Sequence, residues 1–443
     1  AAFLERGRGA ALGLWSAMSA AGVLYGTLFG AYVQQRYSWE WIFFITSGLT
    51  AVCLVLAGAV PESRDRSLLR GLDFAGILTG TPAVALLAYA VVEGNLLGWT
   101  HEYVLGGLAS GVLLLVIFAL VESRRRHPIV TVWYSGHATL SGSNAVAAAA
   151  FFALMALGVF LVAYLQTILG HPAGEAALLL MPLAGALVVV APIAGMISDR
   201  LGSRALMTCG CLLAAGGLAL LLQSDLSTSY ESVLLPALAL TGFGMGLLLG
   251  ATTSAALGVV DPGRVGGASG MHNSVRQLGI LLGIALLGVV VASAFDTSLQ
   301  TKLVEAGLDP STAQTIVRSD SAQAASMGGP LEPIRDLVPA GTAPGVIDGA
   351  STAAEESFVD GMHSAMFLSV GFLLLAAIIS LVFVRSHVVS LHRVEPDGTG
   401  DEEAPSRAQA DPAPTPAAAV AGTDEPEDGA AEDAVEDLPA HVS

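Results

Sequence analysis

Apolar runs alternate with short polar segments along most of the chain, and each run has roughly the 20 residues needed to cross the hydrocarbon core of a bilayer. The pattern predicts an all-α polytopic membrane protein with about ten transmembrane helices. The first five spans are predicted at 10–33, 41–60, 74–92, 103–121 and 139–168. The last five are predicted at 176–197, 205–222, 233–259, 275–295 and 363–384.

Composition supports this prediction. The chain is 53% hydrophobic and 13% charged, whereas a soluble domain carries about 25% charged residues. The 51 glycines are typical of transmembrane helices, whose contacts use small residues so that backbones approach closely. A soluble enzyme of this composition would have to bury far more apolar surface than its fold provides, so that class is excluded.

The positive charges predict the orientation. Long loops are left out of the positive-inside rule, which removes Lys302, Arg318 and Arg335 in the segment 296–359. Of the other Lys and Arg residues, only Arg36 falls in the opposite set of loops. The side rich in arginine is therefore expected to be the cytoplasm, with both ends of this chain on it, the segment 296–359 facing outward, and the chain in the plasma membrane.

One polar segment interrupts two apolar runs in the second half of the chain. It reads Gly195-Met-Ile-Ser-Asp199-Arg200-Leu-Gly202-Ser-Arg204. Gly195 permits a close helix contact and Gly202 supplies the backbone freedom that a tight turn needs. Asp199 is expected near the N-terminus of the next helix, where an anion is favoured. Arg200 and Arg204 are expected in the aqueous interface. This hairpin resembles the loop signature of the major facilitator superfamily of secondary transporters.

Further segments narrow the resemblance to the fourteen-helix drug:proton antiporter branch of that superfamily. They are Arg8–Trp15, Trp39–Ile45, Pro61–Ser63, Asp73–Gly76, Glu93–Asn95, Gly98-Trp99, Tyr164–Gln166, Met181–Leu183, Gly266–Gly270, Asn273, Arg276–Gly279 and Gly283. The resemblance implies the major facilitator fold with the first four of fourteen helices missing from this sequence. It divides the chain into the rest of an N-terminal bundle (1–60), two central helices (61–137), a C-terminal six-helix bundle (138–384) and a tail (385–443).

The resemblance also implies a function. It predicts export of small amphipathic or cationic compounds, without a bound cofactor and with the proton gradient as the energy source. Gly22, Gly26 and Gly30 match the antiporter glycine face and are also explained by simple helix packing. Thr27 and Ala31 stand where the family has a proline and part of a glycine pair. Because of this departure, a metabolite transporter of the same fold remains an alternative, and a non-transporting membrane scaffold or sensor is a second one.

Polar residues inside the spans are candidates for a substrate path, since a polar group in hydrocarbon needs a partner or a wet cavity. An interhelical hydrogen bond is the simpler interpretation of each one. The candidates are Asn144, Tyr164, Gln166, Thr252, Thr253 and Ser254. No Asp or Glu lies near the middle of a predicted span, and Glu93 comes nearest. The sequence therefore identifies no acid for proton coupling.

Other chemistry has weak support. The three cysteines lack the partners of a metal site, and Gly242–Gly246 imitates a nucleotide loop inside an apolar run without a preceding strand. The expected partners are a small-molecule substrate and the lipid bilayer, with no nucleic acid. In the segment 296–359 we predict an amphipathic helix over 297–317 and irregular structure beyond it. The acidic, Ala- and Pro-rich tail from Glu395 is expected to be disordered.

Overall fold

The computed structural model describes residues 36–59, 74–97, 101–123, 138–260, 265–339 and 342–385, and seven single positions between 18 and 33. All regular secondary structure among these residues is helical, and no strand occurs among them. Within them, seven helices are long and apolar enough to cross a membrane, and two shorter apolar stretches lie at 75–91 and 102–118. The prediction of an all-helical membrane protein is confirmed.

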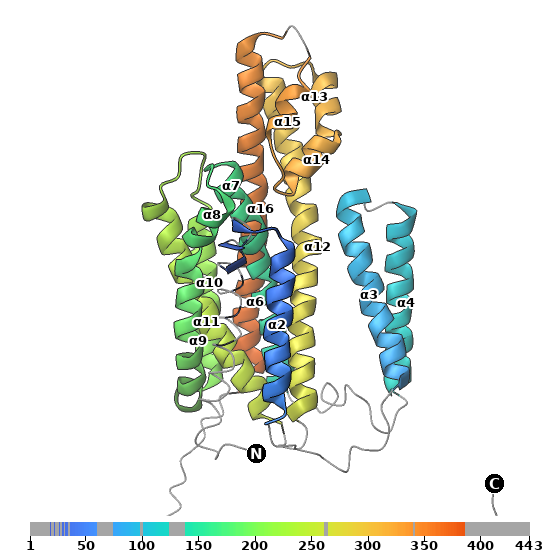
Figure 1. The fold of residues 1–443 in the computed structure, drawn as a ribbon, viewed down its shortest axis with the longest axis vertical. Helices are drawn as coiled ribbons and strands as arrows, with labels where there is room; N and C mark the ends of the chain where they lie inside the picture. Colours follow the sequence, from blue (N-terminus) through green and yellow to red (C-terminus); the bar gives the residue numbers. More distant parts are fainter. Residues whose placement is uncertain are drawn as a thin grey trace, which may run out of the picture. The chain divides into compact units, whose positions relative to one another are not determined.

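The first described helices match the predicted spans closely. They are α2 (Glu40–Ala57), α3 (Phe74–Leu97) and α4 (Glu102–Ser123). Helices α3 and α4 pack as a pair (Figure 1). A Cβ added at Gly107 would lie 3.0 Å from the Cβ of Ala90, so the small residues set the separation of the two helices. No residue of α2 is buried. The predicted span 10–33 and the tail lie largely outside the described residues.

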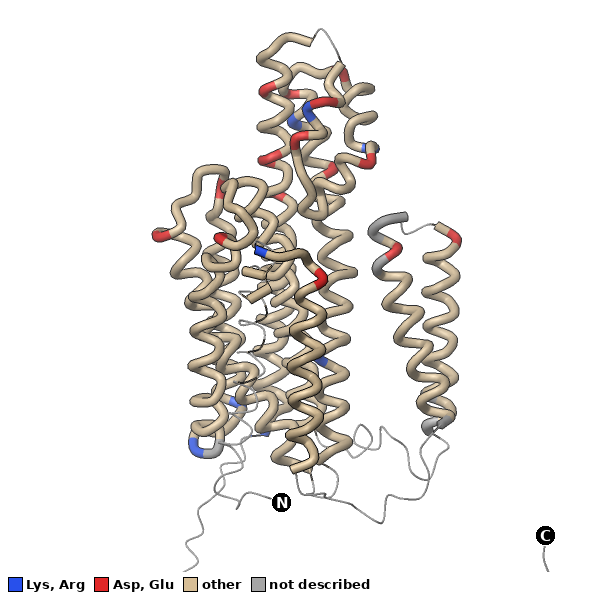
Figure 2. The backbone as a smooth tube through the Cα atoms, in the orientation of Figure 1, with Lys and Arg blue, Asp and Glu red and all other residues tan. Residues whose placement is uncertain are grey.

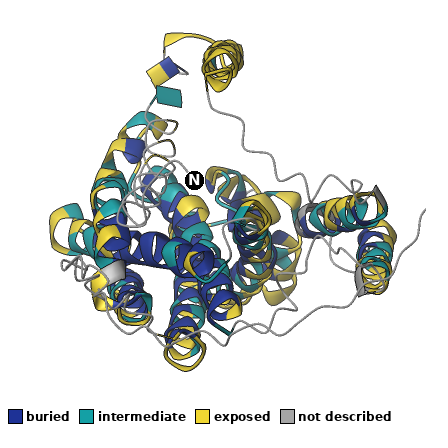
Figure 3. Ribbon diagram, turned by 90° about the horizontal axis from the view of Figure 1, so that it is seen from below, coloured by how far each residue is buried: buried dark blue, intermediate teal, exposed yellow. Residues whose placement is uncertain are grey.

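Six further spans pack around a shared core, and we call them the six-helix bundle (Figures 1 and 3). The first is a continuous run of α6 (Ala138–Met155), a π-helical segment η3 (Ala156–Leu161) and α7 (Val162–Thr167). The others are α9 (Met181–Leu201), α10 (Ser203–Leu221), α11 (Leu235–Gly258) with the π-helical turn η4 (Tyr230–Leu234), α12 (Val265–Glu305) and α16 (Pro344–Phe383).

The predicted span 176–197 is divided in the structure. A short helix, α8 (Ala173–Leu179), ends one residue before Leu180, and α9 begins at Met181. Pro182 occupies the first turn of α9, where its missing N–H costs no hydrogen bond. The proline therefore starts a new helix inside what the hydropathy pattern shows as one run.

The segment 296–359 differs most from its prediction. Residues 296–305 continue α12, and 344–359 begin α16. Between them lie α13 (Pro310–Val317), α14 (Asp320–Ser326) and α15 (Glu332–Asp336). Figure 1 shows these helices together beside the extensions of α12 and α16. The prediction of irregular structure after residue 317 was wrong, and the predicted helix over 297–317 is in fact two helices. We call 296–359 the helical cap.

The hydrophobic core of the six-helix bundle continues into the cap. On α12 the buried residues Val291, Phe295, Leu299 and Leu303 recur every four positions, each at 0% exposure. They form one face of the helix, which continues from the apolar span into the cap. Residues of the other cap helices complete the core: Ala313, Ile316, Ala322, Ala325, Ile334, Ala350, Ala354 and Phe358.

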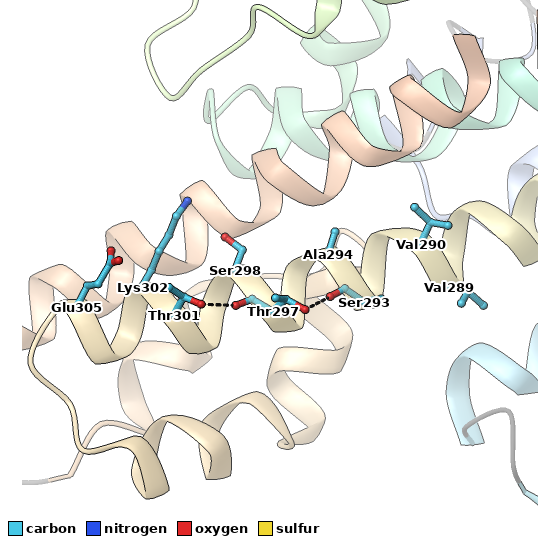
Figure 4. Close-up of a pocket in the computed structure, with 9 residues that line it drawn as sticks. All are labelled: Val289, Val290, Ser293, Ala294, Thr297, Ser298, Thr301, Lys302 and Glu305. Atoms are coloured by element: carbon cyan, nitrogen blue, oxygen red, sulfur yellow. Dashed lines mark hydrogen bonds between the residues drawn. The ribbon is translucent and has the colours of Figure 1, made fainter. Parts of the chain in front are cut away.

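Charged residues are rare along the bundle and gather in the cap and at the helix ends (Figure 2). In the cap, Lys302 on α12 pairs with Asp360 at 2.8 Å and Glu356 at 3.1 Å, both on α16. A groove of about 670 Å³ follows α12 from Val289 to Glu305 and includes Lys302 in its lining (Figure 4). Because the hydroxyls of Thr297 and Thr301 donate to carbonyls one turn earlier on α12, they are satisfied locally.

Candidate functional site

The hairpin Gly195–Arg204 joins α9 to α10 by a turn at a single residue. Helix α9 ends at Leu201 and α10 begins at Ser203. Gly202 between them has φ +81° and ψ 139°, a conformation that essentially only glycine adopts. The hydroxyls of Ser198 and Ser203 lie 2.6 Å apart across the turn. The expectation that Gly202 supplies the backbone freedom for a tight turn is confirmed.

The start of α10 is tied to the end of α16. The carbonyl oxygen of Arg204 accepts hydrogen bonds from the hydroxyls of Thr208, at 3.0 Å, and Ser380, at 3.2 Å. Arg385, just beyond α16, donates its backbone N–H to the hydroxyl of Thr139 at the start of α6 (3.1 Å). Three helices are therefore linked beside the hairpin. The side chains of Arg200 and Arg204 are exposed, and the side chain of Asp199 lies outside what the structure describes.

Gly202→Ala is expected to destabilise this turn. A Cβ at positive φ is strained, and such conformations cost about 1–3 kcal/mol. We expect a lower melting temperature for the purified protein in detergent, measured by differential scanning fluorimetry. Gly185→Ala on α9 is the control, because no atom lies within 4 Å of an added Cβ there. Equal melting temperatures for the two variants would contradict the prediction.

Gly195 lies in a close contact between α9 and α11. A Cβ added at Gly250 on α11 would lie 2.9 Å from the backbone nitrogen of Gly195. One and two turns earlier on α11, a Cβ at Gly246 would lie 2.7 Å from the Cβ of Val190, and one at Gly242 would lie 2.8 Å from the Cα of Leu183. These glycines are spaced four residues apart and form the α11 face that meets α9. The sequence resembling a nucleotide loop is therefore a helix-packing motif.

The antiporter glycine face stays a prediction. Gly22, Gly26 and Gly30 are all helical, which agrees with their expected place on one face of a span. No described atom lies within 4 Å of a Cβ added at any of the three. The described residues therefore provide no helix that packs on this face.

Several candidates for the substrate path have structural hydrogen bonds. Thr252 and Thr253 are buried, and their hydroxyls donate to the carbonyls of Leu248 and Leu249 on the same helix, at 2.6 and 2.9 Å. The buried Tyr164 donates its hydroxyl to the carbonyl of Asp225, at 2.5 Å, in the turn after α10. Gln166 is partly buried. The Tyr164 contact joins its helix to the turn after α10, as the simpler interpretation predicts. The hydroxyls of Thr252 and Thr253 are instead satisfied within α11, rather than by an interhelical hydrogen bond.

The turn that accepts the hydrogen bond from Tyr164 is itself held by hydrogen bonds to the Asp225 side chain. The carboxylate of Asp225 accepts from the backbone N–H of Ser227, at 2.8 Å, and from the hydroxyls of Thr228 and Ser227, at 3.1 Å each. These bonds favour the ionised form, so they hold the pKa of Asp225 below its ordinary value. The same turn provides the carbonyl oxygen that accepts from the hydroxyl of Tyr164.

Asn144 differs from the other candidates because it meets a second polar side chain deep in the bundle. Its Oδ1 lies 2.7 Å from Nδ1 of His272 on α12, and both side chains are only 2% exposed. One turn further along α12, the guanidinium of Arg276 lies over the ring of Phe151, 4.3 Å from its centroid. Sequence reasoning included Asn144 and missed His272. The available signal was the spacing of four between His272 and Arg276, which puts them on one helix face.

Comparison with known proteins places this architecture in a class. Residues 1–284 match the family model of the Major Facilitator Superfamily. With the apolar helices described above, this match shows that the chain is a multi-pass membrane protein and that it belongs to the Major Facilitator Superfamily, a family of membrane transporters. The prediction of the family is confirmed.

The similar proteins are bacterial resistance and export proteins. The multidrug resistance protein Stp of Mycobacterium tuberculosis is 27% identical over 83% of this chain and 67% of its own length. The puromycin resistance protein pur8 of Streptomyces alboniger is 33% identical over 66% and 59%, respectively. The tetracenomycin C resistance and export protein of Streptomyces glaucescens is 29% identical over 89% and 70%. The matched region thus spans about two thirds of each relative.

Proposed function

We propose that this chain acts in secondary active export of small amphipathic or cationic compounds, driven by the proton gradient. The observation that carries the proposal is the family match over residues 1–284 together with relatives named for drug resistance and export. Alternating access in such transporters comes from the rocking of one bundle against another around a central site. The tightly packed six-helix bundle is suited to move as one such body.

The proposal includes a place and an orientation for the chain. Bacterial relatives and the apolar helices support the plasma membrane. The arginine-rich loops support a cytoplasmic hairpin at Gly195–Arg204, with both ends of the chain on that side and the cap outside. There, the hairpin serves as a latch that closes the cytoplasmic side, with Asp199, Arg200 and Arg204 as its charged groups.

The test is transport by the protein purified from its native membrane and reconstituted into liposomes. Ethidium, puromycin and tetracenomycin C are supplied with and without an imposed pH gradient. We expect transport that stops when nigericin in potassium buffer removes the gradient. Transport that persists without the gradient would contradict proton coupling, and absence of transport for all compounds would contradict export.

A metabolite transporter of the same fold is a second candidate, favoured by Thr27 and Ala31 in the first predicted span. Counterflow measurements with amino acids, sugars and organic acids distinguish it from a drug exporter. Exchange of such a solute, with no movement of the drugs above, would favour this candidate.

A further inference from the structure

Helices α6 and α12 run in parallel and pack closely. A Cβ added at Gly279 would lie 2.9 Å from the Cα of Ala148, and one at Gly283 would lie 2.9 Å from the Cβ of Met155. The contacting positions therefore advance from the N-terminus to the C-terminus on both helices, as parallel packing requires. Polar groups buried in such an interface lose their hydrogen bonds to water and need other partners.

Four buried side-chain atoms in the described part of the chain lack any hydrogen-bond partner. They are Nδ2 of Asn144, Oγ of Ser254, Nε2 of His272 and Nε of Arg276. All four residues lie within about three turns of one end of the bundle, counted along α6, α12 and the antiparallel α11. Unpartnered polar atoms concentrated at one level indicate a missing partner rather than scattered packing defects.

Arg276 adds an uncompensated charge. Its guanidinium contacts the face of Phe151, and no carboxylate among the described residues forms an ion pair with it. A cation in a membrane-spanning helix is expected to pair with an anion or to serve a functional site. The partner that fits is a negatively charged oxygen group.

The donors and acceptors of the neighbouring atoms further restrict which chemical groups can be the partner. Because Oδ1 of Asn144 accepts from Nδ1 of His272, the amide group of Asn144 is left to donate and Nε2 of a neutral His272 is left to accept. Arg276 donates from Nε. Two donors and a positive charge suit a carboxylate or phenolate, and the acceptor suits a hydroxyl beside it.

We propose that Asn144, His272 and Arg276 bind the acidic oxygen group of a transported compound, a carboxylate or phenolate with a neighbouring hydroxyl. This inference rests on the proposed export function and specifies a substrate class for it. Hydroxylated acids and phenols therefore belong to the transported compounds, beside the amphipathic or cationic ones.

The experiment compares 3-hydroxy-2-naphthoate with its amide, which has the same shape but no charge. Binding to the purified protein in lipid nanodiscs is measured by the fluorescence of the probe. We expect the acid to bind at least 10-fold more tightly than the amide. Arg276→Gln should remove this preference, and Arg276→Lys should keep part of it. Arg318→Gln, an exposed arginine at the end of α13, is the control and should leave the preference unchanged.

A second variant guards against a folding defect. Asn144→Asp keeps the shape and the contact with His272 but places a carboxylate in the site. The protein should then lose its preference for the acid over the amide, because like charges repel, while its melting temperature is retained. Equal binding of acid and amide by the wild-type protein would overturn the inference. So would loss of bound phosphatidylglycerol in Arg276→Gln without any preference for the acid, since Arg276 would then hold a lipid headgroup.

Transport of ethidium separates the two proposals. If the wild-type protein moves ethidium and its selectivity for the acid does not depend on Arg276, only the inference about the acidic group fails. If the wild-type protein moves none of the compounds, the proposed export function fails, and the binding measurement alone decides whether the site exists.

Discussion

Gly244→Leu is expected to prevent the six-helix bundle from folding. A Cβ at Gly244 would lie 2.7 Å from the carbonyl oxygen of Gly210 and 2.9 Å from the Cα of Ala214, both on α10. These are backbone atoms, which cannot turn aside as a side chain does. Overpacking of a core costs about 1–3 kcal/mol where side chains can shift. A leucine against backbone should exceed this, because α10 and α11 must separate along their length.

The measurement is the yield of monodisperse protein by fluorescence-detected size-exclusion chromatography. Gly371→Leu on α16 is the matched control, since Gly371 is exposed and no atom lies within 4 Å of an added Cβ. We expect normal yield for the control and an aggregate peak for Gly244→Leu. A monodisperse Gly244→Leu protein with an unchanged melting temperature would show that the close contact of α10 with α11 is not needed for folding.

Asp199→Asn is expected to abolish transport while membrane insertion stays intact. Asparagine keeps the shape of the side chain and removes the charge. The hairpin then holds only the positive charges of Arg200 and Arg204, so the attraction on which the proposed latch depends is lost. The turn itself should persist, since it depends on Gly202 and on the pairing of Ser198 with Ser203.

Drug efflux from cells expressing the variant measures the effect, with the amount of membrane-inserted protein determined in parallel. Glu231→Gln, an exposed acid in η4, removes an equal charge away from the hairpin and should leave efflux unchanged. Full efflux by a well-inserted Asp199→Asn protein would exclude a latch based on this carboxylate.

The membrane spans were predictable because their signal is local. An apolar run bounded by polar residues fixes both the type and the approximate ends of a helix, as for α4 and α10. The cap was not predictable in this way. Its helices α13, α14 and α15 are short, and a residue such as Leu299 stands singly between polar neighbours. Such residues form a core only because α12 and α16 bring them together across the chain.

In the candidate site, too, local features were predictable from the sequence and contacts between distant residues were not. The turn at Gly202 depends on one residue and its neighbours, so its role was visible in the sequence. The bond between Asn144 and His272 joins residues 128 positions apart, and no local pattern reports such a contact. Arg276 is the second residue of the predicted span 275–295 and was counted with the positive charges of the cytoplasmic side. In the structure it lies well inside α12.

The length of α16 has a mechanical consequence. Its 40 residues correspond to a rod of about 60 Å, roughly twice the thickness of the hydrocarbon core. A tilt of about 10° around its midpoint moves each end by about 5 Å over such a length. The cap, which includes the first turns of α16, therefore shifts with a rotation of the bundle. A binding protein that immobilised the cap would stop movements inside the membrane without entering it.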